Sequence, residues 1–134
     1  MPPLERGKYY LNKQKYPQAI KALEKAAGEK GDIYYYVDTY RYLGDAYTES
    51  GQEYQAISVY RNALQIIHIR LREISSQRRE IRMSLVRESQ GSHVNMSDMQ
   101  EEDMGLADEE WQLKERQGKI KNKVDKLLKA TDIP

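Results

Sequence analysis

The residues that could perform chemistry are few and lie far apart along the chain. The sequence has no cysteine, which excludes disulfide bonds, thiolate metal sites and cysteine nucleophiles. Its two histidines, His68 and His93, lack a carboxylate at the spacing of a metal-binding motif. The eight glycines are scattered, so no glycine-rich loop could cradle a phosphate. We therefore expect a protein without enzymatic activity, bound metal or cofactor. We interpret His68 as a surface residue of a helix.

Three other groups have a functional and a structural interpretation. Residues 98–103 carry four carboxylates that could bind calcium, but the alternating spacing and the obligatory glycine of a calcium-binding loop are absent. The run 34–36 of three tyrosines could stack on a ligand or be phosphorylated, whereas tyrosines at helix contacts usually pack. The methionines of residues 96–104 could form a docking motif for another protein. In each case we favour the structural interpretation, which is a solvated segment or a packing contact.

The composition is that of a small protein outside the membrane. The chain has 134 residues, of which 39% are hydrophobic and 32% charged, enough for one domain or two small ones. No apolar run approaches the roughly 18 residues of a membrane span, and the N-terminal segment lacks a signal-peptide core. We expect an intracellular, cytoplasmic protein.

The elements that must position any site are helices. No proline interrupts the chain between Pro17 and Pro134, and we expect helices over residues 4–13, 17–27, 33–49 and 53–88. Small residues recur in this region at an offset of 37 positions, in the pairs Gly7 and Gly44, Ala19 and Ala56, and Ala26 and Ala63. Because small residues let two backbones approach closely, three pairs at one offset indicate a duplicated helical hairpin.

The second copy of the hairpin has a regular pattern of aromatic and small residues. It reads Tyr40-x2-Leu43-Gly44-x2-Tyr47, followed by Ala56-x3-Tyr60 and Ala63. This pattern resembles the tetratricopeptide repeat, with Tyr40 in place of the tryptophan and Tyr60 in place of the phenylalanine. The first copy departs from it at Arg6, where leucine is usual, and both copies lack the terminal proline. The resemblance covers residues 3–68 and implies an all-α fold that begins with two helical hairpins.

The resemblance also implies a function, because tetratricopeptide arrays are protein-binding scaffolds. It predicts a non-enzymatic adaptor that binds a peptide or helix of a partner protein in a groove lined by the first helix of each repeat. The implied groove residues are Glu5, Lys8, Asn12, Asp38, Arg41, Tyr42, Asp45 and Glu49. The lysine and asparagine pairs that chaperone-binding members use are broken here, which disfavours a chaperone tail as the ligand. Two alternatives remain open: a structural assembly module that dimerises, and a fragment of a larger regulatory protein.

Beyond residue 68 the pattern changes to narrow apolar stripes at heptad spacing. We divide the chain into two repeats over residues 1–68, an extension of the fourth helix over 69–90, an acidic flexible linker over 91–108 and a basic amphipathic helix over 109–134. We expect this last helix to pack against the extension as an antiparallel, coiled-coil-like hairpin, with Arg78 opposite Gln117. Pairing of residues 67–88 with 111–128 of a second chain is the alternative, which would make the protein self-associate.

Charge is segregated along the chain although the net charge is only +1. Residues 67–92 have a net charge of +3, residues 93–112 of −7 and residues 113–134 of +4. The simplest explanation is that the acidic segment pairs with basic segments of the same molecule, or that it links two basic helices. The acidic segment would also compete with phosphates for the basic ones, which disfavours a nucleic-acid partner.

Overall fold

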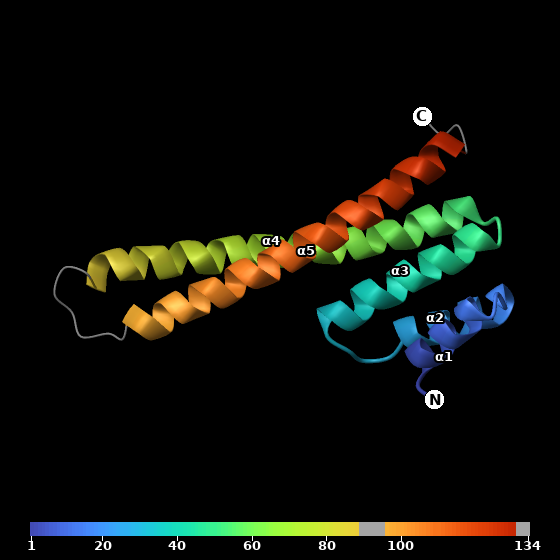
Figure 1. Ribbon diagram of the computed structural model, residues 1–134, viewed down its shortest axis with the longest axis horizontal. Coiled ribbons are helices and arrows are strands. Elements are labelled where there is room, and N and C mark those ends of the chain that lie inside the picture. Colours follow the sequence, from blue (N-terminus) through green and yellow to red (C-terminus); the bar gives the residue numbers. More distant parts are fainter. Residues whose placement is uncertain (89–95, 131–134) are drawn as a thin grey trace.

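The computed structural model describes residues 1–88 and 96–130, and these ranges are built from helices without any strand (Figure 1). The helices are α1 (Pro3–Asn12), α2 (Tyr16–Ala27), α3 (Ile33–Glu49), α4 (Glu53–Glu88) and α5 (Met96–Ala130). Each helix packs on the next one in the chain, and α4 and α5 extend beyond the others as a two-helix arm. The predicted all-α class is confirmed, and α1 to α4 lie within one residue of their predicted bounds.

Local signals explain where the first helices begin and end. Pro3 and Pro17 occupy the first turns of α1 and α2, where a missing backbone N–H costs nothing. Asp32 caps α3 by accepting a hydrogen bond from the backbone N–H of Tyr35 at 2.9 Å. The turn after α3 contains Gly51 at a φ of 79°, the left-handed conformation expected there.

The hairpins α1–α2 and α3–α4 repeat one close contact between helices. A β-carbon at Gly7 would lie 2.5 Å from the side chain of Leu23, and one at Gly44 would lie 2.3 Å from the ring of Tyr60. Leu23 and Tyr60 are separated by the same 37 positions as the two glycines. The alanines of the repeated pattern are fully buried in both hairpins, at positions Ala19, Ala26, Ala56 and Ala63. The landmarks recognised in the sequence therefore occupy equivalent packing positions.

Two hydrophobic clusters hold the helices together. The first joins α1, α2 and α3 through residues such as Leu23 and Leu43. The second joins α3 and α4 to α5 and includes the fully buried side chains of Ile67, Leu113 and Ile120. The two apolar stripes predicted from heptad spacing thus bury one another, and α5 returns along α4 within one chain, as predicted.

The predicted acidic linker over residues 91–108 is wrong for residues 96–108, because α5 already begins at Met96. Residues 91–95 lie outside the described part of the chain. Contacts with α4 support this part of the helix. Asp103 pairs with Arg78, while Leu106 packs against the second hydrophobic cluster. Residues 96–108, whose acidic sequence is typical of a solvated linker, thus form part of the contact between α4 and α5.

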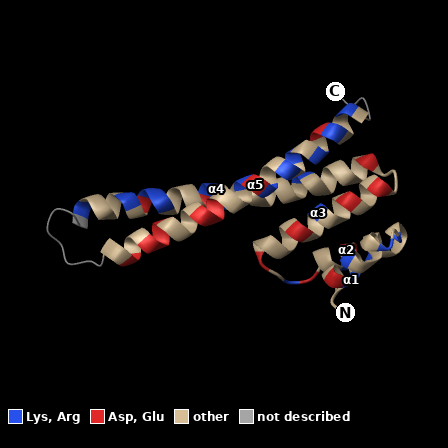
Figure 2. Ribbon diagram, viewed as in Figure 1, with Lys and Arg blue, Asp and Glu red and all other residues tan. Residues whose placement is uncertain are grey.

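Ion pairs set the register of the arm, although not the pair that we expected. Arg78 does not meet Gln117; its Nε lies 2.9 Å from Asp103 Oδ1 and its Nη1 lies 3.0 Å from Glu110 Oε2. Closer to the repeats, Arg70 holds Glu109 through two hydrogen bonds of 2.8 Å each. Figure 2 shows the acidic N-terminal half of α5 beside the basic part of α4. The expected pairing of acidic and basic segments within one molecule is confirmed.

No helix in the described ranges combines the length and the apolar character that crossing a bilayer requires.

Candidate functional site

Four of the eight predicted groove residues, Glu5, Lys8, Arg41 and Tyr42, form one cluster between α1 and α3. The ammonium group of Lys8 lies 5.2 Å from the ring centroid of Tyr42, and the guanidinium group of Arg41 lies 4.5 Å from it. Lys8 also pairs with Glu5 at 3.6 Å. These contacts are favourable cation–π interactions that join the first helices of the two hairpins. Tyr42, a predicted groove residue, is therefore a contact between the two hairpins.

Asp45 has a structural role that the sequence did not indicate. Its carboxylate accepts a hydrogen bond from the hydroxyl of Tyr60 on α4 and another, of 2.7 Å, from the ammonium group of Lys123 on α5. The pKa of the Tyr60 hydroxyl is raised, first by burial and then by its hydrogen bond to Asp45. Asp45 thus ties three helices together and is not a free groove residue.

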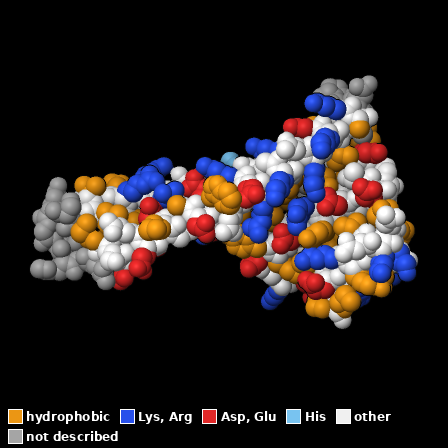
Figure 3. Space-filling view, in the orientation of Figure 1, with side chains coloured by type: hydrophobic (Ala, Val, Ile, Leu, Met, Phe, Trp, Pro, Cys, Tyr) orange, Lys and Arg blue, Asp and Glu red, His pale blue; other side chains and the backbone are white. Residues whose placement is uncertain are grey.

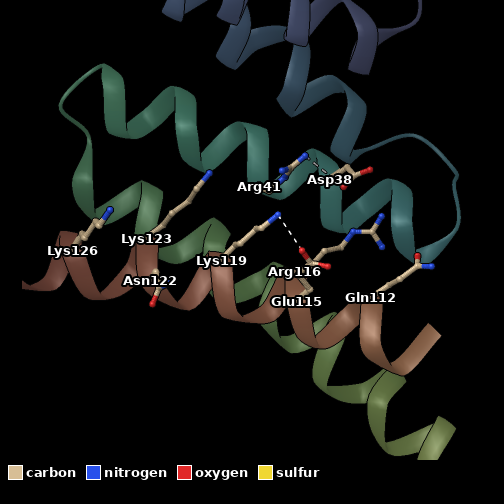
Figure 4. Close-up of a pocket in the computed structure, with 9 residues that line it drawn as sticks. All are labelled: Asp38, Arg41, Gln112, Glu115, Arg116, Lys119, Asn122, Lys123 and Lys126. Atoms are coloured by element: carbon tan, nitrogen blue, oxygen red, sulfur yellow. Dashed lines mark ion pairs between the residues drawn. The ribbon is translucent and has the colours of Figure 1, made fainter. Parts of the chain in front are cut away.

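The other predicted groove residues line two clefts that α5 completes. Asn12, Asp45 and Glu49 contribute to a cleft of about 750 Å³, whose opposite wall is the last part of α5. Asp38 and Arg41 contribute to a second cleft of about 660 Å³, which we call the α3–α5 cleft. Its lining consists of Asp38, Arg41, Gln112, Glu115, Arg116, Lys119, Asn122, Lys123 and Lys126 (Figure 4).

The predicted groove comprises residues of α1 and α3 alone and omits the contribution of α5 to the clefts. Arg116, Lys119, Lys123 and Lys126 follow one another at steps of three and four, which places them on one face of a helix. Figure 3 shows that basic side chains gather where this half of α5 passes over the repeats. The spacing was the available signal, but only the tertiary structure shows which helix the face meets.

A polar network fixes α5 beneath the α3–α5 cleft. The hydroxyl of Tyr34 donates a hydrogen bond to Glu109, the same carboxylate that Arg70 holds. Burial raises the pKa of Tyr34 to about 12, and the hydrogen bond to Glu109 adds to this effect. The hydrogen bonds from Arg70 lower the pKa of Glu109. The guanidinium group of Arg116 lies 5.3 Å from the ring centroid of Tyr34. The network connects α3, α4 and α5, so the walls of the cleft are held in place.

The other described residues that were considered for chemistry lie outside both clefts. Within the described ranges, no three side chains of histidine, aspartate or glutamate are placed to hold a metal ion. His68 is exposed on α4, as predicted, whereas His93 lies outside the described residues. Tyr34 and Tyr35 pack against the hydrophobic clusters, and the hydroxyl of Tyr36 donates to the carbonyl oxygen of Glu29 at 2.7 Å. The tyrosine run therefore serves packing and loop contacts.

Comparison with known proteins finds no family model that matches this chain and no curated protein with significant similarity to it. The tetratricopeptide resemblance therefore stays a prediction. It rests on the motif of residues 40–63 and on the equivalent contacts of Gly7 and Gly44.

Proposed function

We propose that this chain is a non-enzymatic protein-interaction module, a tetratricopeptide-like adaptor or scaffold of the cytoplasm. It binds a peptide or a helix of a partner protein. The observation that carries the proposal is the repeated contact of Gly7 with Leu23 and of Gly44 with Tyr60. The same glycine contact recurs 37 positions later in the chain, which supports two copies of a single hairpin type. Stacked hairpins of this kind create extended binding surfaces.

The position of α5 supports the same function. α5 packs on α4, the last helix of the second hairpin, just as α3 packs on α2, the last helix of the first hairpin. Stacked repeats need such a terminal helix, because the last hairpin otherwise exposes an apolar face. The two clefts beside it, of about 660 and 750 Å³, are large enough for several side chains of a bound peptide.

Selection from a random peptide library on the immobilised full chain tests this function directly. Asn122 is an exposed residue of the α3–α5 cleft, and Asn122→Trp narrows the cleft without removing a buried contact. Gln18 is exposed on α2, outside both clefts, so Gln18→Trp is the matched control. We expect wild type and the control to enrich the same peptides and Asn122→Trp to lose them. A selection that enriches no peptide at all would refute the function.

One observation favours the alternative of a structural assembly module. The arm exposes several large apolar side chains, among them Met83, Met104 and Trp111 at 58%, 70% and 64% exposure. Two arms could pair through such residues, although the heptad stripe of α4 is already covered by α5. Sedimentation velocity over a range of concentrations separates the two functions. A monomer at all concentrations favours the adaptor, and a dimer that Met83→Ser dissociates favours assembly.

A further inference from the structure

The α3–α5 cleft contains more positive than negative charge. Five of its nine lining residues are lysine or arginine, and two are acidic. Three of the cations have carboxylate partners: Arg41 with Asp38 at 3.9 Å, Lys119 with Glu115 at 3.6 Å and Lys123 with Asp45 at 2.7 Å. Only the last of these pairs is short. Arg116 and Lys126 form no ion pair with any residue of the described ranges. Within residues 1–88 and 96–130, part of this positive charge therefore has no counter-ion.

Both arginines of the cleft also have unused hydrogen-bonding capacity. Arg41 Nε and Arg116 Nη1 are buried and have no hydrogen-bond acceptor, and no other buried side-chain nitrogen or oxygen of residues 1–88 and 96–130 lacks a partner. Buried donors normally have acceptors, so two exceptions in one cleft need an explanation. Stacking on Tyr42 and Tyr34 holds the two guanidinium groups in place. The structure thus contains two cations that are held in place and whose buried donors have no acceptor among the described residues.

The chemistry of the cleft suits an acidic peptide better than a nucleic acid. A single strand is bound mainly by stacking its bases on aromatic rings, but the rings of Tyr34 and Tyr42 are already covered by cations. Asp38 and Glu115 lie within the lining. A nucleic acid carries a phosphate at every step and would meet both carboxylates, whereas a peptide can place neutral residues opposite them.

We propose that the α3–α5 cleft binds an acidic segment of a partner protein, and that Arg41 and Arg116 are the residues that select its carboxylates. The proposal rests on the interaction function given above and names the chemistry of the ligand. Guanidinium groups bind carboxylates through two parallel hydrogen bonds, so each arginine can hold one aspartate or glutamate side chain.

The probe for the test is a fluorescein-labelled peptide of alternating glutamate and alanine, titrated with the full chain and followed by fluorescence anisotropy. A peptide of alternating lysine and alanine serves as the charge control. We expect the glutamate peptide to bind and the lysine peptide not to bind. Arg116→Gln and Arg41→Gln should each weaken binding about tenfold, the loss expected for one charge-assisted contact. Asp38→Asn should tighten binding, because it removes a carboxylate that repels the ligand.

Variants of exposed lysines keep the test independent of folding. Lys126→Gln removes a cleft cation from an exposed position and should weaken binding by about threefold, in line with an exposed charge contact. Lys21 is exposed on α2, outside the cleft, so Lys21→Gln removes the same charge and should have no effect. Equal losses for these two variants would mean that only the overall charge matters, and the proposal would be wrong.

Two further outcomes would overturn the proposal. The first is no binding of the glutamate peptide, and the second is its displacement by a single-stranded oligonucleotide at a lower concentration than by unlabelled peptide. The library selection described above separates this failure from that of the general function. Enriched peptides that depend on Asn122 but carry no acidic residues would leave the adaptor function intact and refute only the acidic ligand.

Discussion

The close approach of α3 and α4 at Gly44 leads to a prediction with an unusual sign. An alanine in place of a helical glycine normally stabilises a protein, because glycine loses the most backbone entropy on folding. At Gly44 the new β-carbon would lie 2.3, 2.6 and 2.6 Å from three atoms of the Tyr60 ring. That ring is only 1% exposed, and its hydroxyl is bound to Asp45, so it cannot swing away. We expect Gly44→Ala to destabilise the protein.

Two opposing terms determine the size of the effect. The better helix propensity of alanine contributes about 1 kcal/mol in favour of folding. Overpacking of a well-filled core costs about 1–3 kcal/mol, and the upper end of this range applies here because the ring of Tyr60 is buried. The free energy of unfolding should therefore fall by about 2 kcal/mol, taking the difference of the two terms.

The chain offers a matched control on another helix. A β-carbon at Gly118 of α5 would have no atom within 4 Å, so Gly118→Ala keeps only the propensity term. It should raise the free energy of unfolding by about 1 kcal/mol, and the two variants should differ by about 3 kcal/mol. Urea unfolding followed by far-ultraviolet circular dichroism measures both changes. If Gly44→Ala were as stable as Gly118→Ala, the helices would not meet at the glycine, and the argument for equivalent hairpins would fail.

Three more predictions concern the contacts of α5. Asp45→Ala should lower the free energy of unfolding by about 1–3 kcal/mol, because it leaves the buried hydroxyl of Tyr60 without its acceptor. The control Asp125→Ala changes an exposed residue of α5 and should alter the free energy of unfolding by less than about 0.5 kcal/mol. Equal urea midpoints for the two variants would contradict the tertiary role of Asp45. In the folded protein the pKa of Glu109 is lowered from its ordinary value of 4.5. The Glu109 carboxylate therefore contributes its full stabilisation above pH 4.5, and this stabilisation is lost as the pH falls through the lower folded pKa. Thermal melts over this pH range should show a smaller loss for Glu109→Gln than for wild type, and identical profiles would refute the contribution. Deletion of residues 109–134 should expose the apolar stripe of α4 and cause concentration-dependent association in sedimentation velocity; a soluble monomer of unchanged stability would show that α5 is dispensable.

The helices of the two hairpins could be predicted from the sequence because their signals are local. Pro17 and Asp32 mark helix starts, and Gly51 marks a turn, through backbone preferences that need no distant partner. The repeated glycines and alanines could be recognised for a related reason. Close packing of two helices demands small residues at fixed spacing, whatever surrounds the hairpin.

The first part of α5 could not be predicted, because its helix depends on a partner. Residues 96–108 are acidic and show no apolar period, which in isolation is the pattern of a solvated linker. Their helical form is supported by tertiary contacts such as the pair of Asp103 with Arg78. The charges of the segments indicated that acidic and basic parts attract one another, but they carried no information on the register of the two helices. The predicted partner of Arg78, Gln117, was therefore wrong, and Arg78 pairs with Asp103 and Glu110.

For the candidate site, the sequence by itself determined helices α1 and α3 and the side chains that they carry. Only the tertiary structure decided that α5 lies beside α3, where Arg116 joins Arg41 in one cleft. It also decided that Asp45 is used to hold Lys123 and Tyr60. The physical reason is that a binding cleft depends on the distance between helices. That distance is set by the long-range packing of Leu113 and Ile120 on α4, which no local pattern contains.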